Sequence, residues 1–289
     1  MAGGVAVRAN LLCVTWSAAR GHVFLFDLEA ARPVSAWTLP AGSRGYSDAA
    51  GVAIDPHFQI LVADPHGDRV CHFSAFGRHL GDFGAMAPPV GDAARDRAGV
   101  LDRPHAVALL GDTVLVACGD HPRRNGVQRF ARDGRSLRSL PCGGDADAKF
   151  GAPRALWVDR DGVLVADTLQ GRVQRFRADG AFVSHLTWTP RGVLARPIAV
   201  QRDAGGRVLV VDVGDEPGVF AIGAAGERQP VAAIQAECRE PIALTADERG
   251  RVYVLDHGGE RVVRFARDLT FEQVVVDLRE HLDEFPLRS

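Results

Sequence analysis

The sequence has few of the features that direct a protein to a membrane or to nucleic acid. No apolar run approaches the roughly 18 residues that a membrane-spanning helix requires. The N-terminal stretch MAGGVAVRANLLCVTW lacks a charged segment followed by a long apolar core, so we expect no secretory signal and a cytoplasmic location. The net charge is −2, and aromatic residues make up 7% of the chain. We therefore expect no membrane association, and nucleic acid is not a favoured partner.

The cysteines exclude another class of fold. The chain has five cysteines, an odd number, and no two of them have CxxC spacing. Scattered cysteines of this kind are typical of reduced, mostly buried thiols rather than of a disulfide framework or a zinc knuckle. They are Cys13, Cys71, Cys118, Cys142 and Cys238.

What the sequence does contain is a repeat. The stretch VLVADTLQGRVQRFRADG, which starts at Val163, recurs in similar form as ILVADPHGDRVCHFSAFG from Ile60 and as VYVLDHGGERVVRFARD from Val252. Each copy reads as two short strands around a polar loop, with an aspartate ending the first strand. An arginine follows five residues later, then a valine, and a phenylalanine closes the unit. These positions are Asp64, Arg69, Val70 and Phe73; Asp167, Arg172, Val173 and Phe176; and Asp256, Arg261, Val262 and Phe265.

Three fainter copies complete the pattern and indicate the fold. One has Cys118 at the aspartate position, one keeps Asp212 without the arginine, and LLCVTWSAARGHVFLFDLE has only the strand–loop–strand shape. A short apolar run precedes each copy and a strand candidate follows most of them. Each unit then holds about four strands in roughly 45 residues, which is the period of a propeller blade. The sequence therefore predicts an all-β protein, a six-bladed β-propeller of four-stranded antiparallel blades.

We expect this propeller to form a single domain over residues 1–289. The blades are expected at about 4–45, 46–98, 99–148, 149–193, 194–238 and 239–280. Giving each blade four strands of its own would leave ring closure to packing of blade 1 against blade 6, while pairing of the first and last strands within one blade stays open. Helical periodicity is almost absent, with LREHLDEF near the C-terminus as the exception.

The repeated aspartate and arginine are interpreted as architecture rather than chemistry. Short acidic side chains in turns accept backbone hydrogen bonds, so we expect the aspartate to do so across the hairpin loop. The arginine is expected to pair with a neighbouring blade or with a carbonyl group. The phenylalanines that should fill the gaps between blades are Phe73, Phe130, Phe176 and Phe265.

On these residues the chain resembles the NHL-repeat family. GVLVADTLQGRVQRFRADG, QILVADPHGDRVCHF and RVYVLDHGGERVVRF look like NHL repeats, and the resemblance is weaker in the other three units. It implies a six-bladed propeller around a central channel. It does not specify a function, because the family includes recognition domains of ligases, lyases and sensor domains.

In such a propeller, the loops between second and third strands share one face with the connections between blades and with the channel mouth. His105 and Arg154 stand where innermost strands begin, at the channel rim. The long connection from Gly84 to Pro104 is expected to arch over the same rim. The candidate ligand-binding residues of this face are His66, His105, His121, Arg123, Arg124, Arg154 and His257.

A zinc-dependent lyase is one enzymatic alternative. Propellers that resemble peptidyl-hydroxyglycine lyase ligate zinc through histidines at several blade starts, and a catalytic zinc takes about three protein ligands. Here His105 is the single histidine at such a position. A divergent cluster of His66, His105, His121 and His257 stays open, and with it a divalent metal.

Two other enzyme types fit less well. Calcium-dependent lactonases use side-chain oxygens of Asn, Asp and Glu inside the channel, whereas this chain has only Asn10 and Asn125 as asparagines. A metal-free enzyme like strictosidine synthase would have Glu240 as its one carboxylate beside a blade start. No GxSxG nucleophile elbow is present.

The sequence thus favours a monomeric binding or interaction module for a protein or a small ligand, with no cofactor. The alternative is a small-molecule lyase, hydrolase or cyclase with a divergent site at the central channel, in which a metal could assist. No catalytic residue is assigned.

Overall fold

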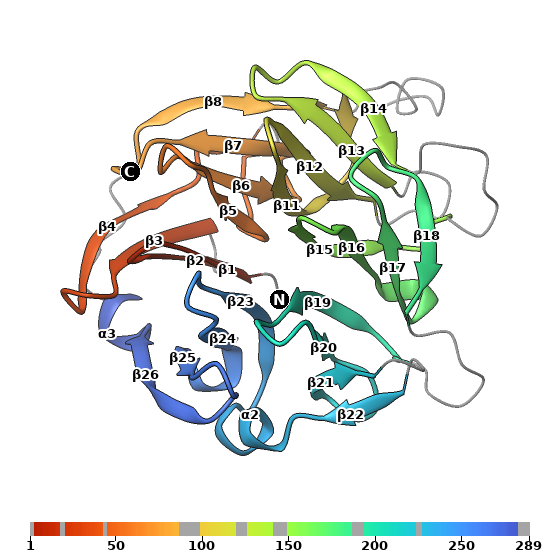
Figure 1. The fold of residues 1–289 in the computed structure, drawn as a ribbon. Helices are drawn as coiled ribbons and strands as arrows, with labels where there is room; N and C mark the ends of the chain where they lie inside the picture. The colour runs from red at the N-terminus through yellow and green to blue at the C-terminus, as the bar shows by residue number, and fades with distance from the viewer. Residues whose placement is uncertain are drawn as a thin grey trace.

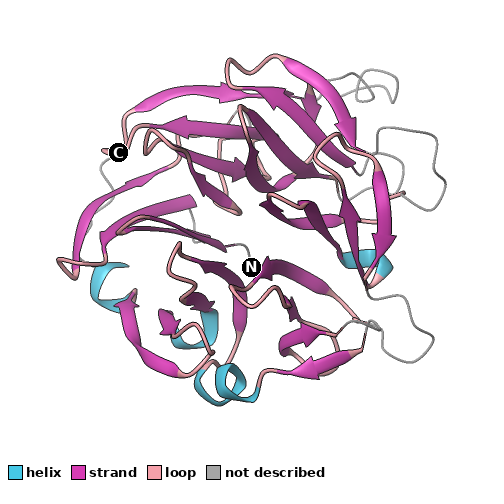
Figure 2. Ribbon diagram, viewed as in Figure 1, coloured by secondary structure: helices cyan, strands magenta, loops and turns pink. Residues whose placement is uncertain are grey.

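The structure is a computed structural model that describes residues 3–17, 21–42, 45–86, 99–119, 126–140, 149–186, 194–223 and 227–282. Six antiparallel sheets of four strands each surround a central axis (Figures 1 and 2). This arrangement confirms the predicted all-β, six-bladed propeller. No helix in the described ranges is long and apolar enough to cross a membrane.

Each blade is built from strands that follow one another in the chain. Blade 1 has β1 (Gly3–Arg8), β2 (Leu11–Ser17), β3 (Gly21–Asp27) and β4 (Arg32–Thr38); blade 2 has β5 (Val52–Ile54), β6 (Ile60–Asp64), β7 (Arg69–Phe73) and β8 (His79–Phe83). Blade 3 has β11 (Pro104–Leu110), β12 (Thr113–Cys118), β13 (Gly126–Ala131) and β14 (Ser136–Leu140); blade 4 has β15 (Pro153–Asp159), β16 (Gly162–Asp167), β17 (Arg172–Phe176) and β18 (Phe182–His185). Blade 5 has β19 (Pro197–Arg202), β20 (Val208–Asp212), β21 (Gly218–Ile222) and β22 (Arg228–Pro230); blade 6 has β23 (Pro241–Ala246), β24 (Val252–Asp256), β25 (Arg261–Phe265) and β26 (Phe271–Asp277).

The first strand of each blade lies nearest the axis and the fourth lies at the outer rim (Figure 1). Blade 1 and blade 6 share no strand, because each sheet is complete within its own stretch of chain. Packing of β1 against β23 closes the ring, in agreement with the expectation from the repeat.

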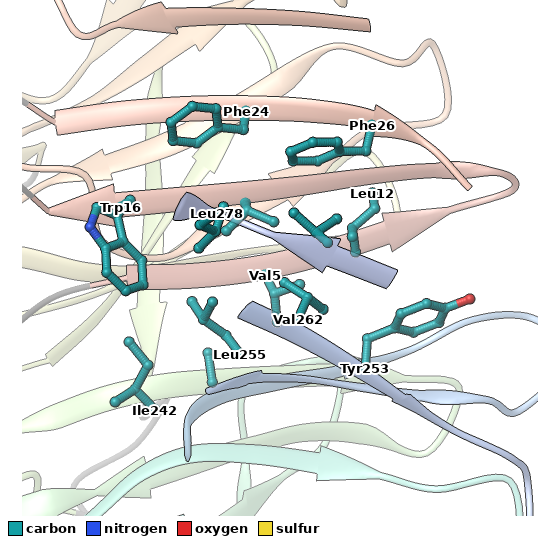
Figure 3. Close-up of a cluster of buried hydrophobic side chains, with 13 residues drawn as sticks. Val5, Leu12, Trp16, Phe24, Phe26, Ile242, Tyr253, Leu255, Val262 and Leu278 are labelled. Atoms are coloured by element: carbon teal, nitrogen blue, oxygen red, sulfur yellow. The ribbon is translucent and has the colours of Figure 1, made fainter. Parts of the chain in front are cut away.

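Six clusters of buried apolar side chains hold neighbouring blades together. Each cluster combines residues of two adjacent blades, so the core follows the six interfaces between the sheets. At the closing seam, Val5, Leu12 and Trp16 of blade 1 face Ile242 and Leu255 of blade 6 (Figure 3). The phenylalanines expected between blades are all at most 1% exposed; they are Phe73, Phe130, Phe176 and Phe265.

A buried carboxylate at the end of the second strand ties each well-formed blade to the connection that leads into it. In blade 4, Asp167 is fully buried and its Oδ1 accepts N–H groups of Gly151 and Ala152, both at 2.8 Å. Arg172 donates from Nε to Asp167 Oδ2 at 3.4 Å, and from Nη2 to the carbonyl oxygen of Lys149. We call this arrangement the aspartate clamp.

The clamp recurs in blades 2 and 6 with the same chemistry. Asp64 accepts from the backbone of Asp48 at 3.0 Å, and Asp256 accepts from the backbone of Glu240 at 2.8 Å. Arg69 and Arg261 bond both to their aspartates and to carbonyl oxygens of the incoming connections. The predicted carbonyl partner of the arginine is therefore confirmed. The predicted bond across the hairpin loop is confirmed in blade 2, where the N–H of Gly67 donates to Asp64 Oδ1 at 2.9 Å. The aspartates also accept from the incoming connection, because those N–H groups lie before the first strand and have no ladder partner.

Blade 3 lacks the clamp and is held by its neighbour instead. A thiol cannot replace a carboxylate that accepts several N–H groups, and Cys118 stands at the aspartate position. Asp68, on the hairpin loop of blade 2 and only 2% exposed, accepts the N–H of Arg103 at 2.9 Å. The start of blade 3 is thus fixed from outside the blade.

Several short elements were not predicted from the sequence. Helix α2 (Ala232–Glu237) lies between blades 5 and 6 and buries Ile234, but six residues are too few for a visible helical period. Strands β9 (Ala85–Met86) and β10 (Val100–Leu101) pair in parallel inside the predicted rim connection. Single-turn helices η2 (Thr168–Gln170) and η3 (His257–Gly259) occupy hairpin loops. Helix α3 (Arg279–Leu282), by contrast, falls within LREHLDEF, the one segment in which the sequence shows helical periodicity.

If the aspartate clamp is essential, Asp167→Asn should lower the free energy of unfolding by about 3 kcal/mol, because it leaves the guanidinium of Arg172 buried without a counter-charge. Urea denaturation followed by fluorescence measures this. Asp179→Asn is the matched control in the same blade, because that carboxylate is 64% exposed. A loss below about 1 kcal/mol in Asp167→Asn, similar to the control, would contradict a structural role for the clamp.

Within the described ranges, seven hairpins use one five-residue turn whose fourth residue has positive φ. Glycine occupies that position at residues 77, 134, 180, 206 and 250, but Phe58 (φ 58°) and Leu269 (φ 72°) replace it in two turns. A non-glycine residue in this conformation costs roughly 1 kcal/mol. Leu269 is 4% exposed and packs in the core between blades 5 and 6, whereas Phe58 is 39% exposed. Buried packing therefore offsets the backbone strain at Leu269 but not at Phe58.

The two exceptions should respond to glycine in opposite ways. Leu269→Gly is expected to lower the free energy of unfolding by about 3 kcal/mol, because it empties a core position. Phe58→Gly should raise that free energy or leave it unchanged, because it relieves strain of roughly 1 kcal/mol. Gly206→Ala, where an added Cβ meets nothing within 4 Å, isolates the backbone cost alone. Chemical denaturation compares the three, and equal losses at positions 58 and 269 would refute this explanation.

Candidate functional site

The channel mouth is formed where the six innermost strands begin. Residues from all six of these strands line a cavity of about 100 Å³ on the axis. The strands approach one another closely, since the N–H of Gly51 donates to the carbonyl oxygen of His105 at 2.8 Å. A Cβ at Gly51 would lie 2.7 Å from that oxygen, so glycine is required there. The result is a narrow channel lined by glycine and aliphatic residues together with His105 and Arg154.

A β-bulge places one side chain from each of four blades at this cavity. The pairing register shifts directly after the proline that starts β11, β15, β19 and β23. A bulge redirects the extra residue, and bulges recur next to functional sites. The bulged residues are His105, Arg154, Ile198 and Ile242, and all four line the cavity. Two adjacent blades, 3 and 4, therefore contribute the polar groups, as the sequence predicted for His105 and Arg154.

His66 and His257 lie on the same face and each faces a carboxylate of its own blade. The Nδ1 atom of His66 is 3.6 Å from Oδ2 of Asp48, and Nδ1 of His257 is 3.4 Å from Oε2 of Glu240. His66 is half-exposed and meets the ring of Tyr46 edge-on, with centroids 4.9 Å apart.

His257 is more enclosed than His66. It stacks on Trp16 of blade 1, with ring centroids 4.8 Å apart and planes within 10°. This contact crosses the seam between blades 6 and 1. The imidazole is therefore held by the packing of the seam as well as by Glu240 of its own blade.

Charge is distributed unevenly around the mouth. Asp48 and Glu240, in blades 2 and 6, occupy equivalent positions, three residues before Gly51 and Ala243 of the innermost strands. The same position is arginine in blades 3 and 5, where Arg103 and Arg196 are exposed. With His105 and Arg154, these blade-start residues make the rim basic over blades 3 to 5 (the basic half) and acidic over blades 2 and 6 (the acidic half). The β20–β21 loop of blade 5 adds the exposed carboxylates of Asp215 and Glu216 to the same face.

Three candidate residues, His121, Arg123 and Arg124, lie outside the described ranges. The described residues of the long rim connection include the β9–β10 pair at its base. Nowhere in the described part of the chain do three or more His, Cys, Asp or Glu side chains gather closely enough to hold a metal ion.

Sequence reasoning missed Asp48, Tyr46 and Trp16 as residues of this face. Asp48 could have been found by aligning blade starts, because it shares its position with Glu240. Trp16 could not, since its contact with His257 joins the first blade to the last.

Comparison with known proteins supports the fold of the chain. No protein-family model matches the sequence, and comparison with curated proteins finds no match either. A streptogramin B lyase structure is similar with a TM-score of 0.62 and 13% identity, over 94% of this chain and 81% of that chain. A protein of unknown function from Bacteroides caccae has a TM-score of 0.63 and 15% identity, over 94% and 96%. A chain of a nidogen/laminin complex has a TM-score of 0.62 and 18% identity, over 89% of both chains. At such identities the shared feature is the six-bladed propeller, and the NHL resemblance stays a prediction.

The described cysteines do not supply a nucleophile. Cys13, Cys71, Cys118 and Cys238 are all buried. Burial raises the pKa of Cys118 to about 11 and that of Cys238 to about 12, and it raises the pKa of Cys13 and Cys71 even further. These thiols are therefore protonated near neutral pH.

In a Cys142→Ser variant we expect none of the four buried thiols to react with Ellman's reagent at about pH 8 while the protein is folded, because the thiolate is the reacting species. All four should react in denaturant, which serves as the internal control. Rapid release of one equivalent of chromophore from the native variant would show an accessible thiolate and overturn this expectation.

Proposed function

We propose that the protein is a binding module whose channel mouth receives an acidic group presented by a protein partner. The observation that carries this proposal is the size and lining of the axial cavity. Its volume of about 100 Å³ is well below the roughly 300 Å³ at which small-molecule sites begin. Such a space fits the end of one side chain rather than a whole substrate.

The lining indicates which kind of side chain fits. His105 and Arg154 are the two polar bulged residues, and both are partly buried, so their interaction with an anion is less screened than at an open surface. A guanidinium offers several N–H donors in a planar fork that matches a carboxylate. The apolar positions Ile198 and Ile242 complete the ring and suit the methylene groups of Asp or Glu.

The surrounding face supports a partner larger than a small molecule. Tyr46, 48% exposed, and the carboxylates of Asp48 and Glu240 lie beyond the cavity, on blades 2 and 6. A peptide segment whose acidic residue enters the mouth would meet the acidic half of the rim with its flanking residues, so basic flanks are expected. The repeat motif supports grouping the chain with NHL-repeat propellers, in which a recognition function is one of those the resemblance implies.

An enzymatic function is the second candidate, and the similar streptogramin B lyase structure is what favours it. The arrangement of the described residues gives it less support, because the axial cavity is small and no cluster of three metal-ligating side chains lies within them. A lyase, hydrolase or cyclase would act at the same mouth, around His105 and Arg154.

The test uses short peptides with one central Glu and basic flanks, compared with the same peptides carrying Gln. We expect calorimetry to show binding of the Glu peptide that Arg154→Gln weakens by about tenfold, with Arg154→Lys intermediate. Arg177→Gln is the matched control, since Arg177 is 66% exposed at the opposite end of the same blade. Equal affinity for Glu and Gln peptides, or equal losses in Arg154→Gln and Arg177→Gln, would reject the proposal.

A further inference from the structure

A second pocket formed by described residues lies on the face opposite the channel mouth. It has a volume of about 520 Å³ and sits at the closing seam, between the hairpin that joins β23 to β24 and the turns of blade 1. This hairpin and the His257 loop are at opposite ends of β24, so the pocket is remote from the candidate site described above. Its volume falls in the range of small-molecule sites, which starts at roughly 300 Å³.

The wall from blade 6 presents guanidinium groups with unused donors. Arg251 bonds through Nε to Asp247 Oδ2 at 2.6 Å, and Arg264 bonds through Nε to Glu272 Oε2 at 2.6 Å. Their side chains are only 23% and 16% exposed. The Nη atoms of both arginines form no hydrogen bond with any residue that the structure describes. These donors are held in place by the Nε bonds and are available to a ligand.

This wall is rigid. The Asp247 carboxylate also accepts the N–H groups of Arg249 and Arg251 and, at 3.1 Å, the hydroxyl of Tyr253. Tyr253 is fully buried, and Figure 3 shows its hydroxyl pointing away from the apolar cluster of the seam. Burial, with the nearby Asp247 carboxylate, raises the pKa of Tyr253 to about 12, so it remains a donor to that carboxylate.

The wall from blade 1 has the opposite charge. Glu29 is exposed, and its backbone N–H is fixed by Asp27 Oδ1 at 2.9 Å. Asn10, held on the same carboxylate at 3.1 Å, and the partly buried Leu28 complete this wall. Glu248 adds a second exposed carboxylate from the tip of the blade 6 hairpin.

The charges of the pocket balance. Its lining holds three arginines (Arg249, Arg251, Arg264) and three acids (Glu29, Asp247, Glu248), so the formal sum is zero. A simple anion would gain little from such a lining, because the three acids offset the three arginines. A ligand that carries both charges would instead satisfy the free Nη donors of blade 6 and the carboxylates of Glu29 and Glu248 together.

We propose that this seam pocket binds a small zwitterion of dipeptide size. Its carboxylate is held by the Nη groups of Arg251 and Arg264, with Arg249 at the edge. Its ammonium group lies against the carboxylates of Glu29 and Glu248. The ligand then bridges blades 1 and 6, which no shared strand joins, and binding stabilises the folded ring.

Calorimetry with a panel of free dipeptides, each compared with its N-acetylated and C-amidated forms, tests the proposal. We expect at least one free dipeptide to bind about tenfold more tightly than either blocked form. Glu29→Gln should remove the advantage over the N-acetylated form, and Arg264→Gln the advantage over the C-amidated form. Because Glu29 is exposed, its variant keeps the test valid if Arg264→Gln unfolds.

Two controls separate this site from other effects. Arg207→Gln removes the equivalent arginine of blade 5, which pairs with Asp203 at 2.7 Å in the same turn but lies outside the pocket. Arg154→Gln removes the candidate group at the channel mouth. Neither should change dipeptide affinity, so failure here and failure of the acidic-peptide proposal are distinguishable. Absence of binding by any free dipeptide at about 10 mM, equal binding of blocked forms, or an equal loss in Arg207→Gln would overturn the proposal.

Discussion

The fold depends on a carboxylate that is buried at the end of a blade's second strand. Removing such a charge from water costs several kcal/mol unless hydrogen bonds and a counter-charge replace the solvent. At Asp167 two backbone N–H groups and Arg172 provide that replacement. The same bonds fix the chain just before it enters the innermost strand, so the clamp also sets the position of the channel rim. In blades 2 and 6 the clamped N–H groups belong to Asp48 and Glu240, whose side chains form the acidic half of that rim. The aspartate clamp of the repeat thus fixes the backbone of the candidate site. The side chains at the rim differ from blade to blade.

The blades differ in the side chains at their starts and in whether they have the aspartate clamp. Blade 3 has no clamp, and its start is held by Asp68 of blade 2. Blades 3 and 4 have His105 and Arg154 at the bulge, where blades 5 and 6 have isoleucine. The blade starts are therefore basic in one half of the mouth and acidic in the other, although the six blades share one architecture.

The sequence predicted those features of the fold and of the candidate site that depend on residue spacing within a single blade. The six blades, the interblade phenylalanines and the carbonyl partner of the repeat arginine all follow from spacing within one unit. His105 and Arg154 were placed at the mouth because they follow the proline of a blade start. The role of Asp48 was missed because its blade start, AAGVAID, has no such proline. The seam pocket could not be predicted, since Glu29 and Arg264 come from opposite ends of the sequence and meet only when the ring closes. Helix α2 was missed because six residues carry no period.

Closing the ring without a shared strand has a cost in chain entropy, because the two ends of the chain must be brought together. The loop-closure cost grows with the logarithm of chain length, so joining ends about 250 residues apart costs only about 1.5 kcal/mol more than joining neighbours about 45 apart. Burial of one large apolar side chain contributes about 1.5–3 kcal/mol. Leu12, Leu255 and Leu278 at the seam are each fully buried. A single one of them offsets the additional entropy, so blades 1 and 6 can associate with nearly the same net free energy as any adjacent pair.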